Sequence, residues 1–406
     1  MPSPGRKRRK MNAEFCDKRI QGLRDVYIVA AVRTPIGGYR KMLKNCSPVY
    51  LGVIATKEVI KKSGISCVDV DETIVGCVLT ACHGQNVARQ ISINAGIPVT
   101  CSSVTINKVC SSSMKAVIMG AQAIQLGYRD VVLAIGTESM SNAYYGIPRG
   151  DDNMSTPSVD SMFEDGLNDA FTKLKMGACA EKTFEKYSIS REEQDEYALE
   201  SYRRAQNAWK EGLFNEEVIS VKCPDSSELF QDEEYKRLDI LKVPLLKPVF
   251  VPDTGTVTAA NSSSIADGAA ALLMTSGTFI SHHDCRPMAQ VLGYAEAAIE
   301  PTEFSRAPSV AVKKLLSSTG LLIEEVSLWE VNEAFAATVI VFMRDMGLDS
   351  SRINVRGGSV ALGHPIGASG SRILVTLLHA LKGNQIGVAT ICNGGGEAVA
   401  VAVKRL

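Results

Sequence analysis

The stretch INKVCSSSMKAV, residues 106–117, places a single cysteine between an apolar run and a row of hydroxyl side chains. The residues before Cys110 alternate like a strand, whereas Met114 and Val117 follow helical spacing. Cys110 therefore falls where a strand passes into a helix, and the serines at 111–113 can cap that helix. A thiol at the positive end of a helix is a candidate nucleophile, because that position lowers its pKa towards the thiolate.

Four other segments place a polar or glycine-rich turn beside a buried strand or helix. They are NEAF (332–335), GGSVALGHPIGASG (357–370), ICNGGGEA (391–398) and TAANSSSIADGAAAL (258–272). Glycine-rich backbone is needed where a ligand must approach the main chain closely or where φ is positive. Alone, CNGGG is only a turn, and one histidine before proline is more often structural than catalytic. Their occurrence together with Cys110 favours an active site.

Composition excludes several classes of function. The 406 residues include 44 Lys plus Arg and 44 Asp plus Glu, so no overall field favours nucleic acid or anionic lipid as a partner. No apolar run approaches the ~20 residues that span a bilayer, so no membrane association is expected. The 11 cysteines form no CxxC pair, and the five histidines do not cluster with them at zinc-ligand spacing. Most of these thiols are expected to be buried apolar groups in a reducing compartment.

Strand-like and helical segments alternate along the chain, which predicts an α/β fold with helices on the faces of a sheet. The first part contains predicted strands at 25–32, 73–81, 103–109 and 130–136 and predicted helices at 48–63, at 87–95 and after Cys110. The last part contains predicted strands at 268–276, 288–298 and 328–331, a helix at 308–319, two further helices and the strands IGVATIC and EAVAVAVK. The segment AIQLGYRDVVLAIGTE (123–138) resembles ALKGNQIGVATICNGGGE (380–397) in its order of features, so we expect a duplicated sheet.

The texture of the chain predicts its division into domains. Residues 139–256 are polar and aromatic, with a loop at 147–158 and a charged amphipathic helix near 191–212, and we interpret them as an insertion that carries ligand-contacting loops. The predicted segments are a flexible basic extension (1–24), an N-terminal half (25–138), the inserted loop domain (139–256), the end of the N-terminal half (257–285) and a C-terminal half (286–406).

Together the motifs resemble the thiolase family, and the resemblance runs from about residue 25 to the end of the chain. NKVCSSSMKA, NEAF, GHPIGASG and CNGGG occur in the family's order and approximate spacing. KMGACAE (175–181), EEYKRLD (233–239) and TVTAANSSS (256–264) are most similar to the short-chain, biosynthetic or ketone-body branch with acetyl-CoA acetyltransferase activity. The resemblance implies two similar halves stacked as α-β-α-β-α layers, with the loop domain covering the active site.

The resemblance also implies a mechanism. Cys110 would be the nucleophile that acetyl-CoA acylates, and His364 the base that activates it, so the histidine adds to the lowering of the thiol pKa. Cys392 would take a methyl proton from a second acetyl-CoA. Asn332, through a held water, and His364 would stabilise the enolate, and the backbone N–H groups of Cys110 and Gly394 would bind the oxyanion. The expected reaction is condensation of two acetyl-CoA to acetoacetyl-CoA plus CoA, and the reverse thiolysis.

No cofactor is obligatory in this mechanism, because coenzyme A enters and leaves as part of substrate and product. By family match, the nucleotide side would be lined by Arg237, Leu238, Asp239 and Lys242, although a solvated charge run explains Lys242 equally well. The remaining positions matched to substrate are Ser263, at the pantetheine arm, with Tyr202, Met176 and Phe304. Some members respond to potassium, and the positions that match their ion site are Tyr202, Ala259, Ala260, Ser262 and Val360.

Three residues depart from the family pattern. Ser113 stands where the family usually has glycine, Glu397 follows the triple glycine where small residues are common, and Ser305 follows Phe304 where proline accompanies acceptance of 2-methylacetoacetyl-CoA. The resemblance further implies a homo-oligomer, a tetramer rather than a dimer, with 139–158 in the tetramer contacts. The basic run GRKRRK (5–10) is compatible with a transit-peptide fragment, a nuclear-type basic patch or an upstream extension before Met11, and Glu14 and Asp17 depart from an acid-poor presequence. The mitochondrial matrix is the expected location, with the cytoplasm as the alternative. The ending KRL only loosely matches a peroxisomal signal.

Three alternatives stay open at this point. A 3-ketoacyl-CoA thiolase of broader chain length would use the same residues with a roomier pocket. A decarboxylating ketoacyl synthase would require histidine in place of Cys392. A non-catalytic acyl-CoA-binding protein could retain the fold, although the four reactive residues are intact.

Overall fold

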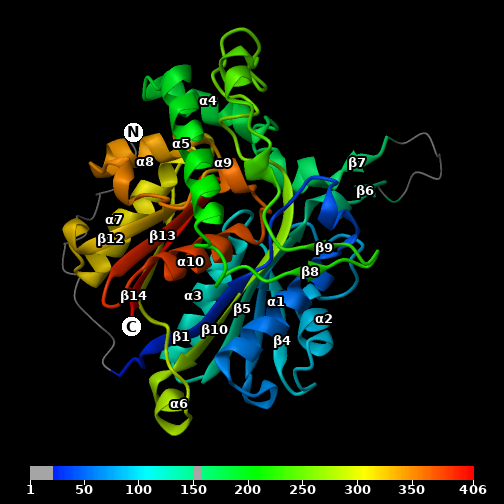
Figure 1. The fold of residues 1–406 in the computed structure, drawn as a ribbon, viewed down its shortest axis with the longest axis vertical. Helices are drawn as coiled ribbons and strands as arrows, with labels where there is room; N and C mark the ends of the chain where they lie inside the picture. The colour runs from blue at the N-terminus through cyan, green and yellow to red at the C-terminus, as the bar shows by residue number, and fades with distance from the viewer. Residues whose placement is uncertain (1–21, 148, 150–156) are drawn as a thin grey trace, which may run out of the picture.

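The structure, a computed structural model, describes residues 22–147, 149 and 157–406. All but the last three positions of the predicted extension 1–24, and most of the loop predicted at 147–158, lie outside the described residues. The described chain forms alternating layers of helix and strand (Figure 1). In this part of the chain, no helix is long and apolar enough to cross a bilayer.

The N-terminal half is built on a mixed sheet in which the strand order is β1-β10-β5-β3-β4. The bounds are β1 Val26–Arg33, β10 Ala266–Ser276, β5 Val131–Ser139, β3 Glu72–Gly76 and β4 Ser102–Ile106, and the short β2, Gly37–Gly38, pairs with β10. β10 runs antiparallel to β1 and β5, whereas β3 is parallel to β5 and β4. Helices α1 (Pro48–Ser63) and α2 (Val87–Asn94) cover the outer face, and α6 (Gly277–His282) follows β10.

The C-terminal half repeats this arrangement, with strand order β11-β14-β13-β12. Its bounds are β11 Ala289–Ala298, β14 Glu397–Arg405, β13 Ile386–Asn393 and β12 Val326–Val331. β14 is antiparallel to both neighbours, β12 is parallel to β13, and a parallel bridge from Trp329 to Ile353 stands where β4 stands in the first half. The predicted duplication is therefore confirmed by topology. Helices α7 (Ala307–Thr319) and α8 (Ala336–Met346) pack on the outer side.

Pairing of β11 with β1 joins the strands of both halves into one continuous sheet. Two helices form the central layer between the halves, α3 (Ser112–Gln125) and α10 (Ser369–Ala380). Their apolar faces share one buried core with strands of both halves, including Val117 and Leu374. Figure 1 shows the two helices next to one another in the middle of the molecule, where they are in contact. Because each half contributes one central helix, the segments that begin these helices lie close together.

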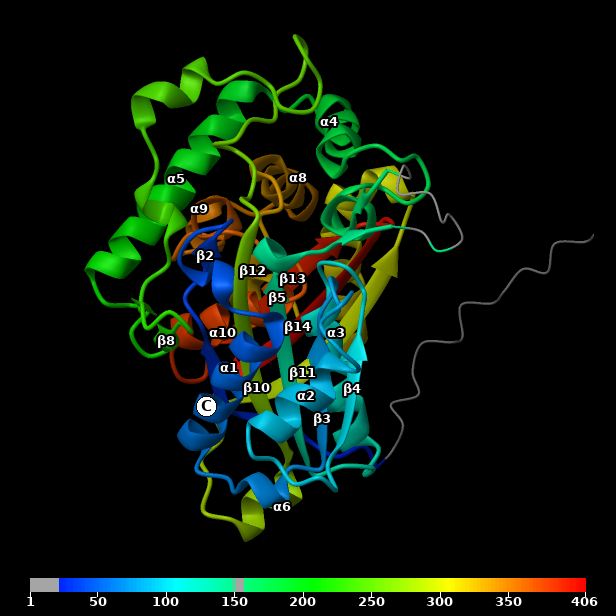
Figure 2. The same cartoon turned by 90° about the vertical axis from the view of Figure 1, so that its right-hand side faces the viewer.

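The inserted segment between β5 and β10 places its two helices in the upper part of the molecule in Figure 2. It contains α4 (Met176–Lys186), α5 (Arg191–Lys210) and two small hairpins, β6–β7 (Tyr145–Gly146 with Val159–Asp160) and β8–β9 (Val221–Lys222 with Glu228–Leu229). The amphipathic helix predicted near 191–212 is α5, which begins with a capping box between Ser190 and Glu193. Helix α5 packs against α8 and the short α9 (Ser359–Leu362) of the C-terminal half.

Two strand predictions were too long. The strand predicted at 73–81 ends at Gly76, because the N–H groups of Val78 and Leu79 bond to the carboxylate of Glu138 instead of a neighbouring strand. The strand predicted at 103–109 ends at residue 106, since the chain turns sharply before Cys110. Both strands end because the chain leaves the sheet to reach the start of α3.

The first turn of α3 packs unusually close to its neighbours. A Cβ atom on Gly76 would lie 2.3 Å from the backbone nitrogen of Ser113, and one on Gly136 would lie 2.4 Å from the Ser113 Cβ. A Cβ on Gly370, in α10, would lie 2.6 Å from the backbone nitrogen of Met114. The hydroxyl of Ser113 accepts the N–H of Ser371 at 2.8 Å, so the side chain that departs from the family pattern joins the two central helices.

We expect Gly76→Ala to lower the free energy of unfolding by about 1–3 kcal/mol, because the new methyl group meets backbone that cannot move independently. Thermal unfolding measures the loss. Gly383→Ala is the matched control, because a Cβ there meets no atom within 4 Å and Gly383 has no positive φ. Equal unfolding temperatures for the two variants would contradict close packing at the start of α3.

Candidate active site

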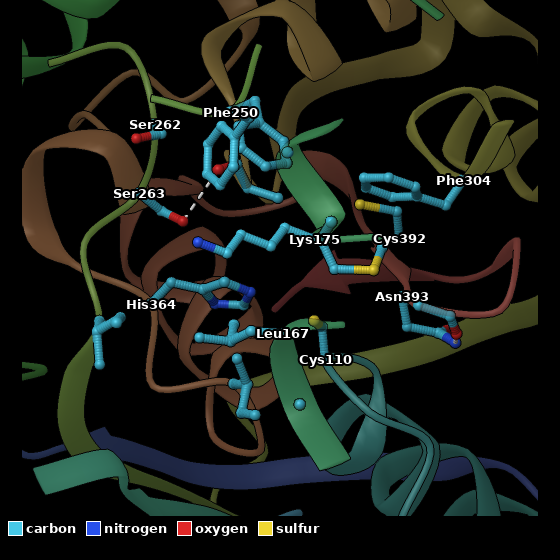
Figure 3. Close-up of a pocket in the computed structure, with 18 of the residues that line it drawn as sticks. Cys110, Leu167, Lys175, Phe250, Ser262, Ser263, Phe304, His364, Cys392 and Asn393 are labelled. Carbon is cyan, nitrogen blue, oxygen red and sulfur yellow. Dashed lines mark hydrogen bonds between the residues drawn. The ribbon is translucent and has the colours of Figure 1, made fainter. Parts of the chain in front are cut away.

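A cavity of about 320 Å³ lies where the two halves and the inserted segment meet. Cys110, His364 and Cys392 all line it, so the structure brings together the three predicted reactive side chains (Figure 3). Cys110 lies two residues before the start of α3, His364 lies between α9 and α10, and Cys392 lies near the end of β13. The rest of the lining is mainly apolar, which suits acyl and pantetheine groups better than free ions.

Hydrogen bonds fix the tautomer of His364. Its Nδ1 lies 2.5 Å from the hydroxyl of Ser369, which itself donates to the carbonyl of Pro365 at 2.9 Å. The hydroxyl must therefore accept the proton on Nδ1, which leaves Nε2 as a free base. Burial and the nearby charge of Arg372 lower the pKa of His364 to about 3, so the imidazole is neutral at ordinary pH.

Asn332 is held beside this histidine. Its Nδ2 lies 3.5 Å from Nε2 of His364, and its Oδ1 accepts the hydroxyl of Ser359 at 2.7 Å. Arg372, almost completely buried, donates to that same hydroxyl at 2.7 Å. This chain fixes the amide orientation, so the NH₂ group faces the histidine and the cavity.

The structure corrects one prediction about Cys110. Burial raises the pKa of its thiol to about 12, whereas the backbone N–H groups of Gly394 and Cys110 act to lower it. Cys110 precedes the N-cap residue Ser111, and the nearby His364 carries no charge that could stabilise a thiolate. The free protein therefore holds a neutral thiol beside a neutral base.

The turn that carries Cys110 is strained. Val109 has φ of +49°, a left-handed conformation that a β-branched residue rarely adopts. Its N–H donates to Oδ1 of Asn107 at 2.8 Å, and its carbonyl accepts the hydroxyl of Ser112 at 2.6 Å. Ser112 also accepts the N–H of Lys108 at 2.8 Å. Hydrogen bonds to the side chains of Asn107 and Ser112 thus hold the strained backbone that precedes Cys110.

Cys392 is almost completely buried, and burial together with the proximity of Cys110 raises the pKa of its thiol. The strand that carries it continues into a tight turn, in which Gly395 and Gly396 have φ of +90° and +80°. Gly394, just before them, lines the cavity with Cys392. The CNGGG motif therefore places a thiol and a backbone N–H on the same wall.

Sequence reasoning assigned no role to two buried carboxylates. Glu138 accepts the N–H groups of Val78, Leu79 and Gly367 at 3.0, 3.1 and 2.9 Å, and so joins two loops beside the cavity. Burial raises the pKa of Glu138 to about 7. The sequence signal for Glu138 was its position at the end of a predicted buried strand, in the segment 123–138 that resembles 380–397.

Glu333, in the NEAF motif, is the second of these carboxylates. It accepts hydrogen bonds from Tyr197, Ser201, Asn354 and the N–H of Val360, at 2.8–3.0 Å. These bonds tie α5 of the inserted segment to the C-terminal half, which carries Asn332 and His364. The quoted motif contained Glu333, but nothing in its neighbours along the chain indicated these distant partners.

The predicted substrate residues separate into two groups. Ser263, Met176 and Phe304 line the cavity, as does Ser262. The four nucleotide-side candidates do not line it: Arg237 pairs with Glu234 at 2.8 Å and Lys242 with Asp239 at 2.9 Å, and Leu238 lies near them along the chain. Tyr202 is buried in the adjoining core, also outside the cavity lining.

The positions matched to potassium carry free oxygen atoms. In the described chain, no protein hydrogen bond reaches the carbonyls of Ala259, Ala260 or Ser262. The N–H of His364, the helical donor for the Val360 carbonyl, bonds to Ser264 at 2.9 Å instead. Carbonyl oxygens suit a hard monovalent cation, so these positions carry the type of donor that the ion requires.

Comparison with known proteins agrees with this architecture. Residues 26–278 match the thiolase N-terminal domain, and residues 285–405 match the thiolase C-terminal domain. The mitochondrial acetyl-CoA acetyltransferase of Rattus norvegicus is 45% identical over 95% of this chain and 92% of its own. Acetyl-CoA acetyltransferase A of Xenopus laevis, also mitochondrial, is 44% identical over 95% of this chain and 93% of its own.

Two solved structures share the fold of this chain over nearly its whole length. A crystal structure of an Ascaris suum thiolase in complex with coenzyme A has a TM-score of 0.92 and 55% identity, covering 94% of this chain and 100% of that chain. The acetyl-CoA acetyltransferase of Bacillus anthracis has a TM-score of 0.90 and 36% identity, covering 95% of this chain and 100% of that chain. With both domains matched in order around one cavity that holds two cysteines and a histidine, this chain belongs to the thiolase family of acyltransferases.

Proposed function

We propose that this protein is an acetyl-CoA C-acetyltransferase, which condenses two acetyl-CoA to acetoacetyl-CoA plus CoA and catalyses the reverse thiolysis. The observation that carries the proposal is the meeting of Cys110, Cys392 and a neutral His364 in one mainly apolar cavity. The similarity to acetyl-CoA acetyltransferases over nearly the whole chain supports the substrate.

In the first half-reaction, the sulfur of Cys110 attacks the thioester carbonyl of acetyl-CoA while its proton passes to Nε2 of His364. The tetrahedral oxyanion accepts hydrogen bonds from the N–H groups of Cys110 and Gly394. One such preorganised donor lowers the activation free energy by about 3 kcal/mol. Collapse expels CoA as a thiolate, which takes the proton back from His364. Transfer between neutral groups suits a buried site, because no isolated charge persists there.

In the second half-reaction, the Cys392 thiol passes its proton to Nε2 of His364, and the resulting thiolate takes a methyl proton from a second acetyl-CoA. The protonated His364 and, through a held water, Asn332 stabilise the enolate that forms. The enolate carbon attacks the acetyl carbonyl on Cys110, a carbon–carbon bond forms, and the sulfur of Cys110 leaves as a thiolate that takes the proton from His364. Cys392 is buried and Cys110 is half-buried in a mainly apolar cavity, which limits hydrolysis of the acetyl-enzyme by bulk water.

Short-chain specificity is proposed from Met176 and Phe304, which line the acyl side of the cavity. Arg237, Leu238, Asp239 and Lys242 are proposed for the nucleotide, with Ser263 at the pantetheine arm. Tyr202 is proposed at the potassium site with the carbonyls of residues 259, 260, 262 and 360. An enzyme of broader chain length is the second candidate, because the cavity lining is largely apolar.

We further propose a mitochondrial protein, since the similar acetyltransferases of Rattus norvegicus and Xenopus laevis carry that description. The division at residues 24, 138, 256 and 285 stands as a proposal that the strand order supports, because β10 completes the N-terminal sheet after the insertion.

Loss of each cysteine should damage a different half-reaction. Cys110→Ala should leave no radiolabelled acetyl group on the protein after treatment with acetyl-CoA. Cys392→Ala should still become acetylated, but condensation should fall about 10²–10⁴-fold, because no group remains to take the methyl proton. Solvent-deuterium exchange into the acetyl methyl reports that step. Rapid exchange and condensation in Cys392→Ala would show that this cysteine is structural.

Acetoacetyl-CoA should be cleaved with a higher kcat/KM than longer 3-ketoacyl-CoAs, because Phe304 is proposed to close the acyl pocket that it lines. Steady-state thiolysis against acyl chain length measures this. Equal cleavage of 3-ketohexadecanoyl-CoA would favour the broader thiolase.

Potassium should raise the rate of thiolysis relative to sodium, because the carbonyls at the ion positions accept no protein hydrogen bond in the described chain. The same assay with each salt at equal ionic strength measures this effect. Identical rates in the two salts would exclude the ion's role.

A homo-oligomer, a tetramer rather than a dimer, is also proposed. Strand β4 lies at the end of its sheet, where pairing across a two-fold axis is available. Tyr144, Tyr145, Ile147 and Val159 expose apolar surface on and beside β6 and β7, within and next to the predicted contact segment. Light scattering at micromolar concentration should give about four times the chain mass, and a monomer would contradict this proposal.

A further inference from the structure

The proposed oxyanion site is assembled from two turns that belong to opposite halves of the chain. One is the turn 107–110 before α3, and the other is the glycine turn 394–396 between β13 and β14. The turns are in contact, since a Cβ on Gly394 would lie 3.8 Å from Cγ1 of Val109. Each turn supplies one of the two N–H donors, so their separation determines the geometry of the site.

Two side-chain ties join these turns. The inner tie is buried: the hydroxyl of Ser111 donates to Oδ1 of Asn393 at 2.7 Å. The outer tie is an ion pair, in which Nζ of Lys108 lies 2.7 Å from Oε2 of Glu397. Glu397 begins β14 directly opposite Asn393, so both ties act on the same end of the hairpin.

The outer tie is anchored in a local network of charges. Lys108 also lies 3.5 Å from Oε2 of Glu296, which is itself paired with Lys115 of α3. The Lys108 side chain is only 17% exposed, so its charge depends on these carboxylates more than on water. Glu397 faces solvent more, and it is the residue that departs from the family's small side chain.

We propose that the Lys108–Glu397 ion pair is a positioning device, which holds the strained nucleophile turn against the glycine turn and so sets the distance between the N–H groups of Cys110 and Gly394. The inference rests on the proposed acyl transfer. The local bonds of Asn107 and Ser112 hold the positive φ of Val109 within the turn, but a tie to the other half is needed to fix where this turn lies against residues 394–396. A ~1 Å error in such geometry can cost as much as 10²-fold in rate.

The test is a double-mutant cycle on the acetylation half-reaction. Lys108→Met and Glu397→Gln are each expected to slow single-turnover formation of acetyl-Cys110 roughly three- to tenfold, while KM for acetyl-CoA changes less than about twofold. The double variant should be no slower than the slower single variant, because both changes remove one interaction. Glu397→Asp, which keeps the carboxylate, should lie between wild type and Glu397→Gln.

Glu58→Gln is the matched control, because it removes the acid of an exposed ion pair with Lys61 on α1, far along the chain from either turn. Its acetylation rate should equal that of wild type. Wild-type acetylation by Glu397→Gln, or additive losses in the double variant, would overturn the inference. If Lys108→Met fails to fold by thermal unfolding, Glu397→Gln and Glu397→Asp still decide it. A wild-type protein that forms no acetyl-enzyme would instead refute the proposed function.

Discussion

The close approach of the two central helices is the constraint on which the rest of the structure depends. Helix α3 can start against β3, β5 and α10 only because Gly76, Gly136 and Gly370 carry no Cβ. That contact brings Cys110, two residues before α3, to the same cavity as His364, which precedes α10. Strands β3 and β4 end early because the chain must leave the sheet to reach the start of α3. Glu138 holds the loop after β3 and the segment before α10 through the N–H groups of Val78 and Gly367. Reactive geometry is thus a consequence of backbone packing between the halves.

Burial has an opposite effect on the two members of the reactive pair. It raises the pKa of the Cys110 thiol and lowers the pKa of His364, so both groups are neutral before substrate arrives. A neutral pair avoids the desolvation cost of an ion pair in an apolar cavity. In the proposed mechanism, the negative charge develops beside the backbone N–H groups of Cys110 and Gly394, which already bond to the Cys110 thiol. Reactivity is therefore generated during the reaction and not stored as a resting thiolate.

Local sequence signals predicted the elements well, whereas contacts between distant segments escaped them. The bounds of α1 matched because Ser47 caps it, Pro48 begins it and Gly64 ends it with φ of +70°. The ends of β3 and β4 did not, because strand ends here depend on where α3 packs. Motifs and family resemblance predicted the three reactive side chains and part of the cavity lining, but the nucleotide-side candidates and Tyr202 lie outside that lining. The pKa of Cys110 could not be predicted in this way, since burial is a property of the whole fold.

The departures from the family pattern acquire meaning when the two halves are considered as one unit. Ser113 of the first half bonds to Ser371 of the second, and Lys108 of the first half pairs with Glu397 of the second. Both departures therefore lie on the contact between halves that brings the turn 107–110 to the glycine turn 394–396. The reactive side chains come from different halves of the chain. Their distances from one another are therefore fixed only if this contact has a single geometry. A hydroxyl and a carboxylate at these positions add directional bonds where a glycine or a small side chain provides none.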